Sequence, residues 1–221
     1  MQTVEERLAA LKSSLPPYIK IVAVSKTKPP EMIMEAYGSG HRMFGENRVQ
    51  ELISKREKLP RDIEWHQIGH LQSNKVRYIV PFVSMIESVD SYRLLRIIDR
   101  EAERSGRVID CLLQVHIATE DTKFGFSIDE IREMLNNETF MLLKNIRIRG
   151  LMGMATFTDD MSVVRTEFRQ LRRWFEQIRD DYFNGDTDFN EVSMGMSGDY
   201  MVAVEEGSTI IRVGSLIFGE R

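Results

Sequence analysis

Short apolar segments recur along the chain, and segments with a helical pattern separate them. The first, residues 19–25, reads IKIVAVS and is an almost unbroken run of apolar and β-branched residues. Runs of this length and composition are typical of parallel strands that are covered on both faces. Seven more segments have the same character: 42–45, 64–69, 82–88, 110–117, 147–154, 190–196 and 209–214. The pattern therefore predicts eight strands.

Helical periodicity fills the intervals between these segments. Thr3 and Glu6 form a capping-box pattern ahead of apolar residues at helical spacing, and Ser127 with Glu130 repeats it. The clearest helical pattern covers 161–181, where apolar residues recur every three or four positions. Because strand and helix alternate throughout, the chain is predicted to consist of parallel β-α units.

Eight such units in roughly 200 residues suit a small (β/α)8 TIM barrel, here with one extra helix at its amino terminus. We expect residues 1–221 to form a single α/β domain, since no linker or change of composition interrupts them. An open doubly wound sheet is the alternative, because the pattern alone does not prove closure. Such a sheet should carry a nucleotide fingerprint, and no G-x-G-x-x-G follows the first strand. The barrel is favoured.

Composition narrows the class of protein. The 221 residues are 42% hydrophobic and 29% charged with a net charge of −4, which disfavours nucleic acid or an anionic membrane as the main partner. The one cysteine, Cys111, excludes an internal disulfide. The first residues do not resemble a signal peptide, and no apolar run is long enough to span a membrane. We expect a cytoplasmic protein.

Polar residues and glycines gather where the predicted strands end. In a barrel of this kind, functional groups lie at the carboxyl ends of the strands. Four separate strands lead to candidates at this rim, which are Lys26, Asn47, Ser197, Arg212, Gly214 and Ser215. Their convergence from distant parts of the chain is stronger evidence than any one of them alone.

Lys26 is a candidate for a covalent bond to a carbonyl compound. Its amine must lose a proton first, which partial burial or a nearby cation favours. A strand-end lysine that merely reaches solvent is the alternative, and it is the more common case. Ser197 is expected to begin a helix that runs to Gly207, and with Gly214 it lies where barrel phosphate sites form. An ordinary helix cap and turn glycine are the alternatives there.

Arg212 lies in an otherwise apolar strand, so its charge needs an acceptor. One interpretation is a hydrogen bond to the ring nitrogen of pyridoxal. The other is a structural ion pair with Glu46 or Asp199. The histidines His66 and His116 are expected to be hydrogen-bonded residues of the rim, and no spacing of ligands predicts a metal site.

Six segments in a fixed order cover nearly the whole chain: AVSKTKP (23–29), FGEN (44–47), WHQIGHLQSNK (65–75), RGLMGM (149–154), GMSGD (195–199) and STIIRVGSLIFGER (208–221). This combination resembles the pyridoxal phosphate homeostasis proteins, which are barrels similar to the amino-terminal domain of alanine racemase. The resemblance implies that Lys26 carries pyridoxal phosphate as an aldimine. It also implies that Asn47 lies near the ring hydroxyl and that Arg212 faces the pyridine nitrogen. The phosphate would be held by Ser197, Gly214 and Ser215.

Two residues depart from the pattern of that family. His116 stands where an asparagine is usual, and Phe124 stands where a small residue is common. Both lie near the end of the fifth predicted strand, so details of cofactor access are not implied by the resemblance. Lys123 is a candidate second amine for transient cofactor transfer, and a solvated loop lysine is the alternative reading.

Three functions fit these residues: a cofactor carrier, a pyridoxal phosphate-dependent racemase, and a lysine Schiff-base aldolase without cofactor. A racemase of the alanine racemase kind needs an acid opposite the lysine, supplied there by a tyrosine from a second domain. Of the tyrosines in this chain, only Tyr200 is predicted near the mouth. We therefore expect a monomeric carrier that maintains pyridoxal phosphate homeostasis without its own turnover. Its expected partners are the cofactor and apo pyridoxal phosphate-dependent enzymes.

Overall fold

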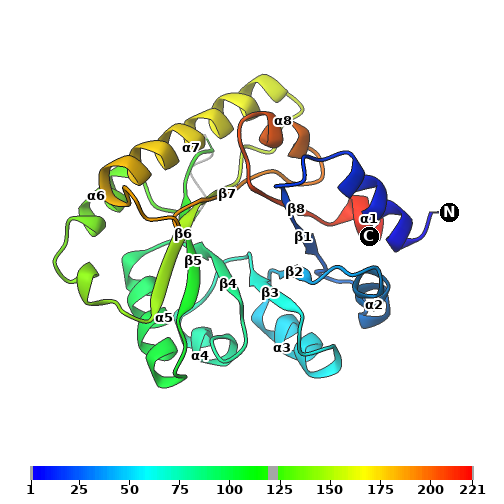
Figure 1. Ribbon diagram of the computed structural model, residues 1–221, viewed down its shortest axis with the longest axis horizontal. Coiled ribbons are helices and arrows are strands. Elements are labelled where there is room, and N and C mark those ends of the chain that lie inside the picture. The colour runs from blue at the N-terminus through cyan, green and yellow to red at the C-terminus, as the bar shows by residue number, and fades with distance from the viewer. Residues whose placement is uncertain (1, 119–123, 221) are drawn as a thin grey trace.

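The eight apolar segments form eight parallel strands that pair in chain order. The computed structural model describes residues 2–118 and 124–220, and within them the order β1-β2-β3-β4-β5-β6-β7-β8 closes into a barrel (Figure 1). The strands are β1 (Lys20–Val24), β2 (Met43–Glu46), β3 (Glu64–Gln67), β4 (Met85–Val89), β5 (Ile109–Val115), β6 (Ile146–Gly153), β7 (Glu191–Ser193) and β8 (Ile210–Val213). All eight predicted strands are confirmed, with shifts of a few residues at their ends.

The ladder between β1 and β8 closes the barrel. Lys20 is in register with Ile210, and Val22 is in register with Arg212. No strand among the described residues therefore keeps an open edge, and the doubly wound alternative is wrong. The closure also brings the start of the chain beside its end, so that α1 (Val4–Ser13) packs against α9 (Ser215–Phe218).

Helices cover the outside of the barrel (Figure 1). They are α1 (Val4–Ser13), α2 (Pro30–Gly38), α3 (Val49–Lys58), α4 (Val76–Ile79), α5 (Tyr92–Arg104), α6 (Ile128–Leu135), α7 (Met161–Tyr182), α8 (Tyr200–Glu205) and α9 (Ser215–Phe218). Short 3-10 turns lie at Ser73–Lys75 and Phe140–Leu142. Both predicted capping boxes are present, at Thr3 with Glu6 and at Ser127 with Glu130.

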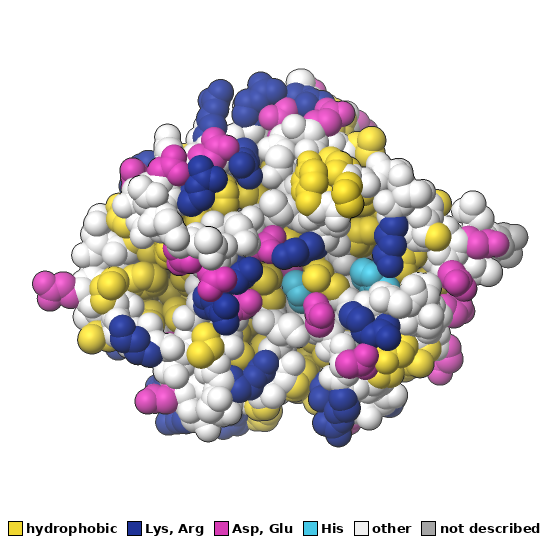
Figure 2. Space-filling model, viewed as in Figure 1, with side chains coloured by type: hydrophobic (Ala, Val, Ile, Leu, Met, Phe, Trp, Pro, Cys, Tyr) yellow, Lys and Arg dark blue, Asp and Glu magenta, His cyan; other side chains and the backbone are white. Residues whose placement is uncertain are grey.

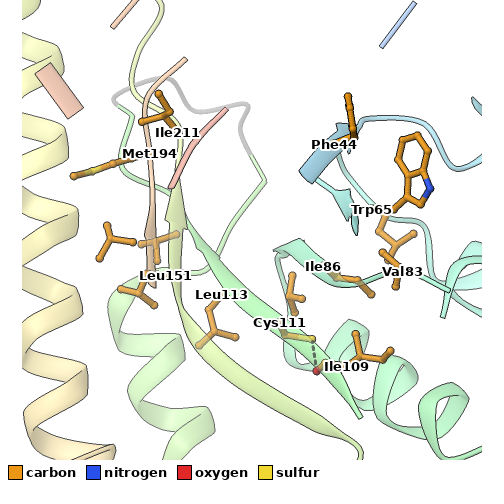
Figure 3. Close-up of a cluster of buried hydrophobic side chains, with 14 of the residues drawn as sticks. Phe44, Trp65, Val83, Ile86, Ile109, Cys111, Leu113, Leu151, Met194 and Ile211 are labelled. Carbon is orange, nitrogen blue, oxygen red and sulfur yellow. Dashed lines mark hydrogen bonds between the residues drawn. The ribbon is translucent and has the colours of Figure 1, made fainter. Parts of the chain in front are cut away.

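Side chains alternate between outward and inward positions along each strand, and this divides the core into two layers. Side chains such as Ala23, Phe44 and Trp65 point outward and pack under the helices, as Figure 3 shows for part of that cluster. Cys111 lies in this layer, with its thiol directed to the carbonyl of Ile109. The inward side chains form a smaller apolar cluster in the barrel interior: Val22, Val24, Ile68, Met85, Leu112, Met152 and Ile210.

The surface mixes charges of both signs. On the face in Figure 2, basic and acidic side chains are interspersed, and no region carries one sign alone. No helix within the described part of the chain has the length and apolar character needed to cross a membrane.

Candidate functional site

A cavity of about 440 Å³ opens at the carboxyl ends of the strands. Its size falls within the roughly 300–1,000 Å³ typical of small-molecule sites. The structure brings all six predicted site residues to its wall: Lys26, Asn47, Ser197, Arg212, Gly214 and Ser215. Apolar side chains from β1, the segment after β3 and the segment after β6 complete the wall with Val24, Ile68 and Met154.

Lys26 is half-buried in a tight turn that directly follows β1. The amide of Lys28 donates to the carbonyl of Ser25 at 3.0 Å and closes this turn. The residue after Lys26, Thr27, has a φ of 65°. A β-branched residue in the left-handed region costs on the order of 1–3 kcal/mol, so the surrounding contacts must hold it there.

The loops after β7 and β8 meet at the opposite wall. The amide of Gly214 donates to Ser197 Oγ at 3.3 Å, which joins the two loops. A Cβ at Gly214 would lie 3.0 Å from the carbonyl oxygen of Val24, so this residue lets β8 approach β1 closely. The amide of Met196 donates to Asp199 Oδ1, and burial raises the pKa of that carboxyl.

The start of α8 differs from the prediction. Ser197 does not begin the helix, because the turn at 197–199 comes first and α8 starts at Tyr200 with Asp199 in the N-cap position. Asp199 folds back onto Met196, which delays the first helical residue. Ser197 Oγ instead bonds to the backbone of the β8 loop.

Arg212 is buried at the base of the cavity and anchored from inside the barrel. Its Nη1 donates to Ser193 Oγ at 2.6 Å, and its Nη2 donates to the carbonyl of Gly153 at 2.9 Å. Ser193 Oγ in turn donates to Glu87 Oε2 at 2.5 Å. The ring of His66 completes the chain, with its Nδ1 2.6 Å from Glu87 Oε1.

Glu87 supplies the negative charge in this buried row of hydrogen-bonded side chains. Its Oε2 lies 3.9 Å from Arg212 Nη1, and its side chain is fully buried. Burial alone would raise the pKa of Glu87, but His66, Arg212 and Ser193 together hold it below its ordinary value. Burial also lowers the pKa of Arg212, which Glu87 and Asp199 oppose. An arginine keeps its proton in proteins, so a cation faces the cavity.

Comparisons with known proteins agree with this geometry. A family model described as "Alanine racemase, N-terminal domain" matches residues 1–221. The pyridoxal phosphate homeostasis protein of Aquifex aeolicus (strain VF5) is 40% identical over 91% of this chain and 87% of its own length. The human protein of the same name is 39% identical over 91% of this chain and 76% of its own length.

The chain belongs to the pyridoxal phosphate homeostasis protein family.

Solved structures extend this finding. PipY of Synechococcus elongatus PCC7942, solved with PLP bound, superposes with a TM-score of 0.89 at 40% identity, covering 98% of this chain and 100% of PipY. The alanine racemase of Clostridium difficile 630 superposes with a TM-score of 0.76 at 14% identity. That pair covers 99% of this chain and 56% of the racemase, and at this identity it shows the shared barrel alone.

The proposed ion-pair partners of Arg212 were partly wrong. Glu46 is not its partner, since Glu46 Oε1 accepts from Ser25 Oγ and Lys55 Nζ, both at 2.6 Å. Asp199 lies near enough to oppose the lowered pKa of Arg212, but the closest carboxylate is that of Glu87. Sequence reasoning missed Glu87, because it lies within the apolar strand MIESV. Its only signal is a charged residue at an inward position.

The two residues that depart from the family pattern, His116 and Phe124, are not among the residues that line the cavity. Phe124 stacks on the ring of His70, with centroids 4.0 Å apart, and His70 Nδ1 lies 2.8 Å from Asp90. His116 donates its backbone amide to the carbonyl of Phe126. Lys123 lies outside the described residues. Across the described residues, no group of three or more His, Cys, Asp or Glu side chains could hold a metal ion.

Proposed function

We propose that this protein holds pyridoxal phosphate in the cavity as a Schiff base on Lys26, as a carrier within cofactor homeostasis and without its own turnover. The observation that carries the proposal is the meeting of Lys26 with the β7 and β8 loops in one cavity. The PLP-bound structure of PipY, at 40% identity, supports the choice of ligand. The match of the segment AVSKTKP (23–29) to the pattern of this family supports the choice of lysine.

The residues present fit each part of the cofactor. The amine of Lys26 would join to the aldehyde carbon with release of water. Ser197, Gly214 and Ser215 would hold the phosphate through a hydroxyl and backbone amides, where glycine allows a close approach. Asn47 would meet the ring hydroxyl, and Arg212 would donate to the ring nitrogen. Hydrolysis of the bond to Lys26 by one water molecule would return the free aldehyde form of the cofactor and the amine of Lys26.

One feature supports a carrier over a racemase. The described residues that line the cavity include no tyrosine, the residue that serves as the opposite acid in alanine racemase. Arg212 is a permanent donor, so a ring nitrogen facing it would stay unprotonated and draw electrons weakly, but alanine racemase has a similar arginine, so this feature does not separate the two functions. In this role the acceptors are apo enzymes that use the same cofactor, and the carrier acts as a monomer.

Borohydride reduction of the loaded protein, followed by peptide mass spectrometry, tests the covalent site. The adduct should map to Lys26 and be absent from Lys26→Ala. Lys28→Ala is the matched control, since Lys28 lines the same cavity and should leave the adduct in place. An adduct on another lysine would refute the site. Sustained racemisation of L- or D-alanine by the loaded protein would refute the carrier role, and light scattering in solution checks the monomer.

A further inference from the structure

Three charged side chains on β2 and α3 form a cluster that holds the backbone of the turn carrying Lys26. The cluster consists of Glu46, Glu51 and Lys55. Lys55 Nζ donates to the backbone carbonyl of Ser25 at 2.7 Å, one residue before Lys26. On the other side of Lys26, the amide of Thr27 donates to Glu51 Oε1 at 2.6 Å. The two backbone neighbours of Lys26 are therefore both held by side chains of α3.

The ammonium group of Lys55 is fully used in this cluster. Besides the carbonyl of Ser25, it donates to Glu46 Oε1 at 2.6 Å and to Glu51 Oε1 at 2.7 Å. An ammonium has three N–H donors, so these three acceptors satisfy it. The residue is 5% exposed, and a buried charge with one well-placed acceptor per proton is fixed in position.

The backbone that the cluster holds is strained. Thr27 has a φ of 65°, a conformation that a β-branched residue adopts only when its surroundings impose it. The bond from its amide to the Glu51 carboxylate is charge-assisted and short, and it acts on the strained residue itself. Ser25 is held a second time, through its hydroxyl, by Glu46 Oε1 at 2.6 Å.

We propose that Lys55, acting with Glu51, is a positioning residue for Lys26. It fixes the strained turn so that the amine of Lys26 starts from the geometry needed for bond formation. This inference rests on the proposed function, because it assumes that Lys26 forms the covalent bond. None of the three side chains of the cluster lines the cavity. Its effect is therefore on the covalent step and not on the recognition of phosphate or ring.

A purely structural role for Lys55 makes a different prediction. Such a role would change stability alone, or would weaken every ligand equally. Two ligands separate the cases: pyridoxal phosphate, which forms the bond, and pyridoxamine phosphate, which carries an amine in place of the aldehyde and cannot form it. Stopped-flow absorbance measures the rate of bond formation with the first, and calorimetry measures the dissociation constant of the second.

The variants are Lys55→Met, Glu51→Gln and, as matched control, Lys58→Met on the exposed side of the same helix. We expect Lys55→Met to slow bond formation at least about tenfold, since small misplacements of a reacting group have effects of this size or larger. Glu51→Gln should slow it about threefold, because the bond to Thr27 loses its charge. Both should bind pyridoxamine phosphate within about twofold of the wild type, as should Lys58→Met.

The inference is overturned if both variants form the bond at the wild-type rate, or if their affinity for pyridoxamine phosphate falls by the same factor as the rate of bond formation. If Lys55→Met does not fold, the partly exposed Glu51→Gln decides the question by the same two measurements. A failure of the proposed function is seen separately, in the wild type, as the absence of a borohydride-trapped adduct on Lys26. In that outcome the positioning role falls with it, before any variant is compared.

Discussion

The pair of Glu87 and Arg212 can be tested by replacing Glu87 with glutamine, which keeps the shape and removes the charge. At the 3.9 Å that separates Glu87 Oε2 from Arg212 Nη1 and an effective dielectric constant of about 20, the Coulomb attraction is about 4 kcal/mol. Removing one partner of a buried pair typically costs about 3–5 kcal/mol. We therefore expect Glu87→Gln to lower the free energy of unfolding by about that amount, as measured by urea denaturation.

A double-mutant cycle isolates the interaction between the two residues. Arg212→Met leaves Glu87 without its cation, and the double variant leaves neither charge buried. We expect the double variant to lose about 2–4 kcal/mol less than the sum of the two single variants. If the losses of the two single variants add up to that of the double variant within about 0.5 kcal/mol, Glu87 does not balance the charge of Arg212, and the inferred ion pair is refuted.

The dependence on pH gives an independent check of the same pair. The pKa of Glu87 is below its ordinary 4.5 in the folded protein, because His66, Arg212 and Ser193 outweigh the effect of burial. The unfolded chain therefore binds this proton first, so the stability is present above pH 4.5 and is lost as the pH falls through the folded value. The advantage of the wild type over Glu87→Gln should shrink in strongly acidic solution.

Three further predictions concern other parts of the barrel. Burial, helped by Lys12, lowers the pKa of His41 from 6.5 to about 4, so stability should fall as the pH drops from 6.5 towards 4. At about 1.4 kcal/mol per pKa unit this amounts to about 3 kcal/mol, and urea denaturation of His41→Gln should show a flatter pH profile. A Cβ at Gly150 would lie 1.8 Å from the carbonyl oxygen of Glu191, so Gly150→Ala should lower the free energy of unfolding by more than about 3 kcal/mol, as measured by thermal melts. The control Gly38→Ala places its methyl group in open space and should not destabilise the protein. Burial raises the pKa of Cys111, so its thiol should react with a disulfide reagent only after unfolding, and rapid labelling of the native protein would contradict its placement.

The strands could be predicted from the sequence because their signals are local. A run such as residues 19–25 carries its own β-branched character, and the capping boxes at Thr3 and Ser127 mark helix starts within four residues. Closure was inferred from the number of units. The pairing of Val22 with Arg212 that achieves it joins residues 190 positions apart, and no local pattern specifies such a register.

The residues that line the cavity were also predictable from local signals, but the buried residues that hold them in place were not. Lys26 and Gly214 follow strands directly, so their place at the carboxyl rim follows from strand direction. Glu87 and Ser193 lie within strands, and their pairing depends on which inward side chains meet across the barrel. Lys55 lies within α3, and its partners depend on how that helix packs against β2 and the turn after β1. The helix after β7 was predicted to start too early, because the bond from Met196 to Asp199 competes with helix formation over three residues.

The pairing of β1 with β8 also bears on how the protein folds. Until β8 is in place, β1 has no partner on one side and the amine of Lys26 has no opposite wall. A nascent polypeptide that stops short of β8 thus has the lysine without the loop that faces it. Competence to take up a ligand between these two walls arises only when β8 pairs with β1, so it reports that the barrel has closed.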